Sequence, residues 1–171
     1  KPIYGADVWL TLPDGTSMGR LCLLADSIVG YKNLTQILSA AYLAQRNNHV
    51  VTVTQDLLCA HGDGLIVLSG GAEGEIGQLL LNGHLEDAAE RLRFWMALFP
   101  ERFFLELTRA GRAQDEACVH ASVTLAAHHQ CPVVATNAVR FLKPEDFEAH
   151  EVRVCIHEGY TLDDARRPRD F

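Results

Sequence analysis

The chain has 171 residues, of which 48% are hydrophobic and 22% are charged, a composition typical of an ordinary globular protein. Its formal net charge of −7 argues against binding to a nucleic-acid backbone by bulk electrostatics, although ARRPRD at 165–170 is a candidate for a local basic patch. The longest apolar runs are too short to span a bilayer. We therefore expect a single domain over residues 1–171, with no membrane partner.

The cysteines indicate a reducing compartment. They are odd in number, widely scattered and free of the CxxC spacing that would suggest a zinc or redox site. Most have apolar neighbours, so we interpret them as small buried hydrophobes of a cytoplasmic protein. No signal peptide is visible, but the chain begins at Lys1 without an initiator methionine, and we expect it to be part of a longer protein. The five are Cys22, Cys59, Cys118, Cys131 and Cys155.

The first half of the chain predicts two strands, a helix, a strand and a helix. Residues 3–10 and 21–25 are strand-like, with a turn at Pro13-Asp14-Gly15 between them. Apolar residues at helical spacing predict a helix from near Asn33 to just before residue 46. GLIVLSGG at 64–71 then predicts a buried strand that runs into a helix at 74–82.

The second half continues the alternation. Seven apolar residues on one face predict a helix over 85–99, which Pro100 ends. A strand is predicted at 103–107, a helix at 115–129 and a buried parallel strand at 133–135. Pro144-Glu145-Asp146 then opens a last helix that runs through His150 and Cys155. Five strands alternating with helices indicate an α/β fold with a parallel sheet, either doubly wound or closed into a barrel.

Two short stretches are ambiguous. VVATNAVRFL at 133–142 ends a strand in Thr136 and Asn137, which could face a ligand site at the carboxyl end of the sheet or merely cap a turn. The glycine-rich stretch at 70–74 could cradle a phosphate, since it precedes a helix. It lacks the Lys-Ser/Thr of a P-loop, and Glu73 would repel an anion, which favours a tight turn.

Several phrases occur in an order that resembles a known family. They are KPIYGADVWL, GYKNLTQILSAAY, GLIVLSGG, FFLELTRAGR, PVVATNAVRFL and FEAHEVRVCIHEGYTLDD. Together they resemble the polymerase-and-histidinol-phosphatase (PHP) domain of the bacterial DNA polymerase III alpha subunit over nearly the whole chain. The resemblance implies an incomplete distorted (βα)7-type barrel: the carboxyl-terminal part of a PHP domain, lacking its first βα units and the polymerase core.

The resemblance also implies where a metal site would lie. Metal-binding members of the family hold a cluster of divalent cations with ligands at strand ends, and five of those positions fall within this chain. An acidic ligand is kept, but arginine replaces histidine at two positions, and the expected cysteine and aspartate are glycine and alanine. Because arginine stays protonated, we expect a vestigial site without metal, and Mg²⁺ only in the polymerase core. The five positions are Asp7, Arg20, Gly71, Ala138 and Arg140, with Asn137 near the site.

Two functions follow from the resemblance. The first is a non-catalytic module that supports the polymerase core, docks the proofreading exonuclease (epsilon) subunit and belongs to the polymerase III holoenzyme, with DNA contacts only through other domains. The second is a residual metal-dependent phosphoesterase or pyrophosphatase. The first hypothesis predicts that Asp7 forms a salt bridge with Arg20 or Arg140. An incomplete barrel with open sheet edges is also expected to self-associate.

Overall fold

The structure, a computed structural model, describes residues 2–12, 15, 18–44, 50–137 and 139–167. It contains six strands, six α-helices and two short 3₁₀ helices within those residues. In chain order they are β1 (Gly5–Thr11), β2 (Met18–Ala25), α1 (Ile28–Ala44), β3 (Thr52–Val53), α2 (Gln55–His61), β4 (Leu65–Leu68), η1 (Gly71–Glu73), α3 (Glu75–Leu81), α4 (Leu85–Leu98), β5 (Phe103–Thr108), α5 (Asp115–His129), β6 (Val133–Thr136), η2 (Pro144–Asp146) and α6 (Phe147–Glu158).

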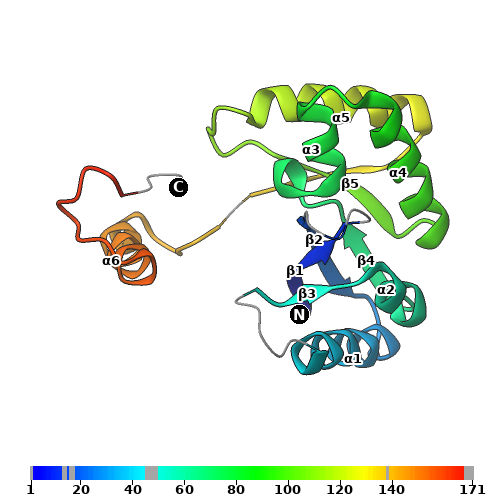
Figure 1. The fold of residues 1–171 in the computed structure, drawn as a ribbon, viewed down its shortest axis with the longest axis horizontal. Coiled ribbons are helices and arrows are strands. Elements are labelled where there is room, and N and C mark those ends of the chain that lie inside the picture. Colours follow the sequence, from blue (N-terminus) through cyan, green and yellow to red (C-terminus); the bar gives the residue numbers. More distant parts are fainter. Residues whose placement is uncertain (1, 13–14, 16–17, 45–49, 138, 168–171) are drawn as a thin grey trace.

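The strands form one sheet in the order β3-β1-β2-β4-β5-β6. The pairs β1–β3, β4–β5 and β5–β6 are parallel, whereas β1–β2 and β2–β4 are antiparallel. The predicted α/β fold with a mostly parallel sheet is therefore confirmed, and β3 and β6 are its open edges. In Figure 1, α1 and α2 group on one side of the strands, and α3, α4 and α5 group on the other.

The order of the strands also corrects one expectation. The apolar run of β6 predicted a buried strand, but β6 lies at an edge, and Val133 is 46% exposed. An edge strand is covered by a neighbour on one side only, so an apolar run does not guarantee burial. None of the helices within the described residues is long and apolar enough to cross a membrane.

Two elements escaped prediction, and one helix starts earlier than expected. β3 has two residues and α2 has seven, which is too short for a clear periodicity. The hydroxyl of Thr54 caps α2 by accepting the N–H of Leu57 at 3.3 Å. The helix predicted from Asn33 begins at Ile28 instead, because the hydroxyl of Ser27 accepts the N–H of Gly30 at 3.2 Å.

The core lies between the sheet and its helices and includes an ion pair. Trp95 of α4 is 1% exposed, and its ring stacks on Phe103 of β5 with centroids 6.2 Å apart. The indole N–H of Trp95 donates to the buried carboxylate of Glu75 at 3.2 Å, and Arg91 contacts the same carboxylate at 2.6 Å. These contacts attach the start of α3 to α4, which fixes the η1–α3 segment from the core side.

The carboxyl-terminal helix α6 stands apart from the other helices (Figure 1). Its buried residues are His150 and Cys155, and the ring of His150 lies 5.6 Å from that of Phe141. Two arginines of the candidate basic patch, Arg166 and Arg167, are paired with carboxylates in this region. Arg167 contacts Glu151 at 2.6 Å and Arg166 contacts Asp164 at 2.8 Å, while residues 168–171 lie outside the described part of the chain.

A candidate charged pocket at the strand ends

A cavity of about 340 Å³ opens where the ends of several strands meet η1, α5 and the segment after β6. Four carboxylates and three arginines line it, so charged groups of both signs face one space. Four of these residues come from β1, β2, η1 and β5. These elements are far apart in sequence, and the fold of the sheet brings them together. The charged residues are Asp7, Glu73, Glu106, Asp115, Arg20, Arg112 and Arg140.

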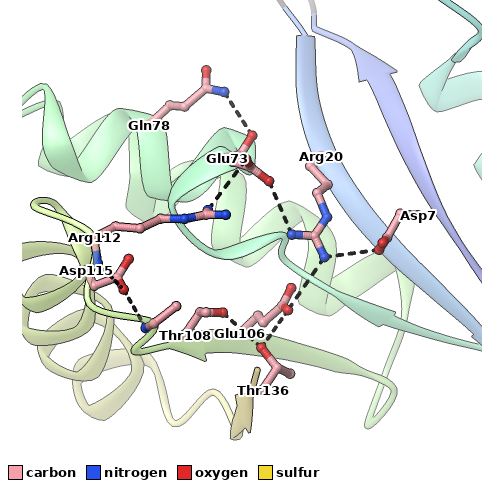
Figure 2. A network of polar contacts seen from close by, with 10 residues as sticks. Asp7, Arg20, Glu73, Gln78, Glu106, Thr108, Arg112, Asp115 and Thr136 are labelled. Atoms are coloured by element: carbon pink, nitrogen blue, oxygen red, sulfur yellow. Dashed lines mark hydrogen bonds and ion pairs between the residues drawn. The ribbon is translucent and has the colours of Figure 1, made fainter. Parts of the chain in front are cut away.

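Arg20 lies at the centre of this charge network, as Figure 2 shows. Its guanidinium NH2 contacts Asp7 Oδ1 at 3.1 Å and Glu106 Oε1 at 3.9 Å. Its NH1 contacts Glu73 Oε2 at 3.3 Å. One cation thus joins three carboxylates from β1, η1 and β5, and the predicted salt bridge of Asp7 with Arg20 is confirmed.

The environment of Arg20 favours its charged form. Burial alone would lower its pKa, but the carboxylates of Asp7, Glu106 and Glu73 outweigh that effect and raise the pKa above the ordinary value. The partners differ in exposure: 58% for the Asp7 side chain, 44% for Glu73 and 5% for Glu106. Water can solvate the first two, so the buried Glu106 depends most on Arg20.

A chain of hydroxyl groups also supports Glu106. The Thr136 hydroxyl of β6 donates to Glu106 Oε1 at 2.7 Å, and the Thr108 and Thr136 oxygens are 2.9 Å apart. Because Thr136 has a single hydroxyl proton and gives it to Glu106, Thr108 must donate to Thr136. Among the described residues, Glu106 Oε2 has no hydrogen-bond partner. Arg20 and Thr136 are therefore the groups that compensate this carboxylate.

Two further contacts complete the rim of the pocket. Glu73 also faces Arg112, with the charged groups 3.7 Å apart. The loop that carries Arg112 is held by Asp115, whose Oδ2 accepts the backbone N–H groups of Ala110 at 2.6 Å and Arg112 at 3.2 Å. The buried Asp115 therefore positions Arg112 from the amino terminus of α5.

The structure brings together most of the residues that the sequence singled out. Asp7, Arg20, Asn137 and Arg140 line the same pocket. Gly71 lies beside it, since a Cβ atom there would be 3.6 Å from the Thr108 hydroxyl. Among the described residues Arg140 forms no ion pair, so of the two arginines it is Arg20 that makes the predicted salt bridge with Asp7. Ala138 lies outside the described residues.

Two charged residues of the pocket were not predicted. Glu106 belongs to a strand whose apolar residues masked it, and Arg112 belongs to a loop without a motif. Thr136 was expected either to face a ligand site or to cap a turn, and it contacts Glu106. A signal for Glu106 was available, because a single carboxylate between the leucines of FFLEL is unusual in a buried strand. Nothing in the local sequence identified Thr136 as its partner.

Sequence comparisons assign the family. The PHP domain family model matches residues 1–110, and the chain therefore belongs to the PHP domain family. It is 49% identical over 172 aligned residues to the DNA polymerase III subunit alpha of Pseudomonas aeruginosa. It is 46% identical to the corresponding subunit of Vibrio cholerae and 44% identical to that of Escherichia coli K12. Each alignment covers 100% of this chain, which spans about 15% of the length of these relatives.

The cysteines are expected to react with a thiol reagent at different rates, because their surroundings differ. Burial raises the pKa of Cys22 to about 12, and the negative charges of Asp7 and Glu106 act in the same direction. Its thiol therefore stays protonated near neutral pH, and only the thiolate is an effective nucleophile. We expect a disulfide reagent at pH 8 to modify the exposed Cys59 and to spare Cys22, as measured by mass spectrometry of the labelled peptides.

The same pKa shift gives a stability effect with a defined sign. The pKa of Cys22 is higher in the folded chain than its ordinary value of 9.0, so ionisation of this thiol does not change the free energy of unfolding below about pH 9. The free energy of unfolding falls as the pH rises from 9 towards 12, because the thiol ionises first in the unfolded chain. Labelling of Cys22 as fast as Cys59 in the folded protein would contradict this description of the pocket.

Proposed function

We propose that this chain is a non-catalytic PHP module of a DNA polymerase III alpha subunit, which supports DNA replication by stabilising the polymerase and binding other subunits. The observation that carries the proposal is the position of Arg20 between three carboxylates of the charged pocket. A fixed guanidinium supplies the positive charge that these carboxylates need without any bound ion. The ion pairs of Arg20 then hold β1, β2, η1 and β5 together, and the pocket performs no chemistry.

The residues present do not fit a cluster of divalent cations. Of the implied ligand positions, Asp7 alone has a side chain that can bind a cation, and its Oδ1 already contacts Arg20. Arg20 cannot lose its proton near neutral pH, so it cannot ligate a cation and would repel one. Arg140 lines the same pocket and adds a second permanent positive charge. We therefore assign no hydrolytic step to this site.

The family relationship supports a role within a larger assembly. The relatives are named as subunits, and this chain spans about 15% of their length, so polymerase chemistry would require segments outside these residues. Within our proposal, the module contributes to the polymerase III complex by docking the proofreading exonuclease subunit. The chemistry of nucleotide addition and its Mg²⁺ would belong to the core of the same polypeptide.

The competing function is a residual metal-dependent phosphoesterase, and an activity assay separates the two. We expect the chain, assayed in the full-length polypeptide, to hydrolyse neither pyrophosphate nor a phosphodiester above background when manganese or zinc is added. The physical reason is that Arg20 and Arg140 repel the cations that would activate water. Hydrolysis is measured as phosphate release over time.

The control is the Asp7→Ala variant, which removes the one retained acidic ligand position. Within our proposal, wild type and variant give the same background rate. Metal-dependent hydrolysis that disappears in the Asp7→Ala protein would contradict the proposal and establish the phosphoesterase. Activity that persists unchanged in the variant would not come from this site.

A further inference from the structure

The turn between α3 and α4 places an asparagine directly before a glycine. Asn82 is the C-cap of α3, Gly83 follows it with a φ of +78°, and both residues are exposed. The side-chain amide carbon of an asparagine is an electrophile, and the backbone nitrogen of the next residue is a nucleophile that can reach it. Glycine hinders this approach least because it has no Cβ atom, and the space around Gly83 is open.

The chemistry available to this pair is an intramolecular loss of ammonia, with water as the only co-reactant. The Gly83 nitrogen bonds to Asn82 Cγ and gives up its proton, while the Cγ–Nδ2 bond breaks and ammonia leaves with that proton. The product is a five-membered succinimide ring, which water opens at one of its two carbonyl carbons. Opening at Cγ gives aspartate. Opening at the main-chain carbonyl carbon gives isoaspartate, in which the backbone runs through the side chain.

In the folded chain the nucleophile is already engaged in a hydrogen bond. The N–H of Gly83 donates to the carbonyl of Leu80 at 3.1 Å. The N–H of His84 donates to the carbonyl of Leu79 at 2.9 Å. With Gly83 in the left-handed region, these two bonds form the Schellman motif that ends many helices. The motif therefore holds the nitrogen that would have to attack Asn82.

The conformation of Asn82 also opposes ring closure. Its ψ is 2°, and its own N–H donates to the carbonyl of Gln78 at 3.1 Å. To close the ring, the Gly83 nitrogen has to rotate about the Cα–C bond of Asn82 towards the side chain, and this rotation breaks the bonds of the motif. The reaction thus requires the last turn of α3 to open, a local event that costs less free energy than global unfolding.

We propose that Asn82 is a site of spontaneous deamidation, and that the Schellman motif at the end of α3 sets its rate. Both reacting groups are adjacent in the chain, and the co-reactant is water. The inference therefore depends neither on the proposed function nor on what contacts this surface in the full-length polypeptide.

The modification acts on the segment that carries Glu73 into the charged pocket. Isoaspartate adds a methylene group to the backbone, so Gly83 and His84 move relative to α3 and lose the two bonds of the motif. The paired helices α3 and α4 hold η1 from the core side through the contact of Glu75 with Trp95. We therefore expect chains that carry isoaspartate at position 82 to unfold at a lower urea concentration than unmodified chains.

The test compares the full-length polypeptide in its folded state and in concentrated guanidinium chloride, both incubated at the same mildly alkaline pH. Peptide mass spectrometry follows the conversion of the Asn82 amide to an acid, and isoaspartyl methyltransferase labels the isoaspartate. We expect conversion in both samples, at a rate roughly 10-fold or more lower in the folded protein. Asn33 is the internal control, because Leu34 follows it and a leucine side chain hinders ring closure.

Two substitutions of His84 test the role of the motif. His84→Pro removes the N–H that bonds to Leu79, and the φ of −83° at this position is close to the value that proline adopts. His84→Ala is the matched control, because it keeps the N–H and removes the same imidazole. We expect the proline variant to deamidate at Asn82 roughly 3-fold or more faster than wild type when folded, and the alanine variant to stay within about 2-fold.

Each contrary result has a defined meaning. If Asn82 keeps its amide in the folded protein after the unfolded chain has been converted completely, it is not a modification site of the native chain and the inference fails. Equal rates in the folded and unfolded samples, or equal rates for the two His84 variants, would show that the motif does not control the reaction. The comparison of wild-type samples decides the outcome even if His84→Pro does not fold.

Discussion

Replacing Arg20 with methionine lowers the free energy of unfolding by about 2–3 kcal/mol. Methionine keeps much of the side-chain volume and removes the charge, so Asp7, Glu73 and Glu106 lose their shared cation. The two exposed carboxylates turn to water at little cost, but Glu106 is 5% exposed and cannot. We place the loss below the value for breaking a fully buried pair, because Arg20 is 24% exposed and lies 3.9 Å from Glu106.

The matched control is Arg109→Met, which removes an arginine from a shorter but exposed ion pair. Arg109 contacts Glu116 at 2.6 Å, and both side chains are at least 60% exposed. Exposed pairs contribute less than about 1 kcal/mol, so this variant should unfold at nearly the same urea concentration as wild type. Equal losses for the two variants would show that the pocket gives Arg20 no special role.

Gly77→Ala destabilises the protein by about 3 kcal/mol, although helix propensity predicts the opposite sign. In a helix interior, alanine is ordinarily favoured over glycine by up to about 1 kcal/mol. In α3, however, a Cβ atom at Gly77 would lie 2.0 Å from the carbonyl oxygen of Gly71, which no rotamer change relieves. The η1 turn and α3 would have to separate, and η1 carries Glu73.

Urea unfolding measures this effect, with Gly83→Ala as the control. Gly83 has a φ of +78° and open space around its position, so alanine there meets backbone strain of about 1 kcal/mol and no clash. Gly77→Ala should therefore lose more stability than Gly83→Ala. A neutral or stabilising Gly77→Ala would show that α3 does not pack on η1 as closely as the structure indicates.

The glycine-rich stretch at 70–74 shows what local sequence can predict and what it cannot. Its composition allowed a phosphate cradle or a tight turn, and the structure shows a turn in which Gly70 and Gly71 have positive φ values of 80° and 58°. A Cβ atom at Gly70 would lie 2.1 Å from the carbonyl oxygen of Arg20, so this glycine lets η1 approach β2. Sequence could predict the turn but not this approach, which depends on residues 50 positions apart.

The same limit applies to the pocket. The long amphipathic helices were predictable, because α4 carries a repeating apolar face that ends before Pro100. The salt bridge of Asp7 with Arg20 was predictable from family positions. The contact of Glu106 with Thr136 was not, since it depends on the pairing of β5 with β6. Likewise, the start signal Pro144-Glu145-Asp146 predicts the helix α6 but not its position apart from the other helices.

A double-mutant cycle between Arg20 and Glu106 measures whether the guanidinium compensates the buried carboxylate. Unfolding free energies are measured for wild type, Arg20→Met, Glu106→Gln and the double variant, with a chelator present throughout. If Arg20 compensates the buried carboxylate, the second substitution costs less once the first is made, and the coupling energy is about 1–2 kcal/mol. Losses that add within about 0.5 kcal/mol would contradict this role of Arg20, because Arg20 and Glu106 would then act independently.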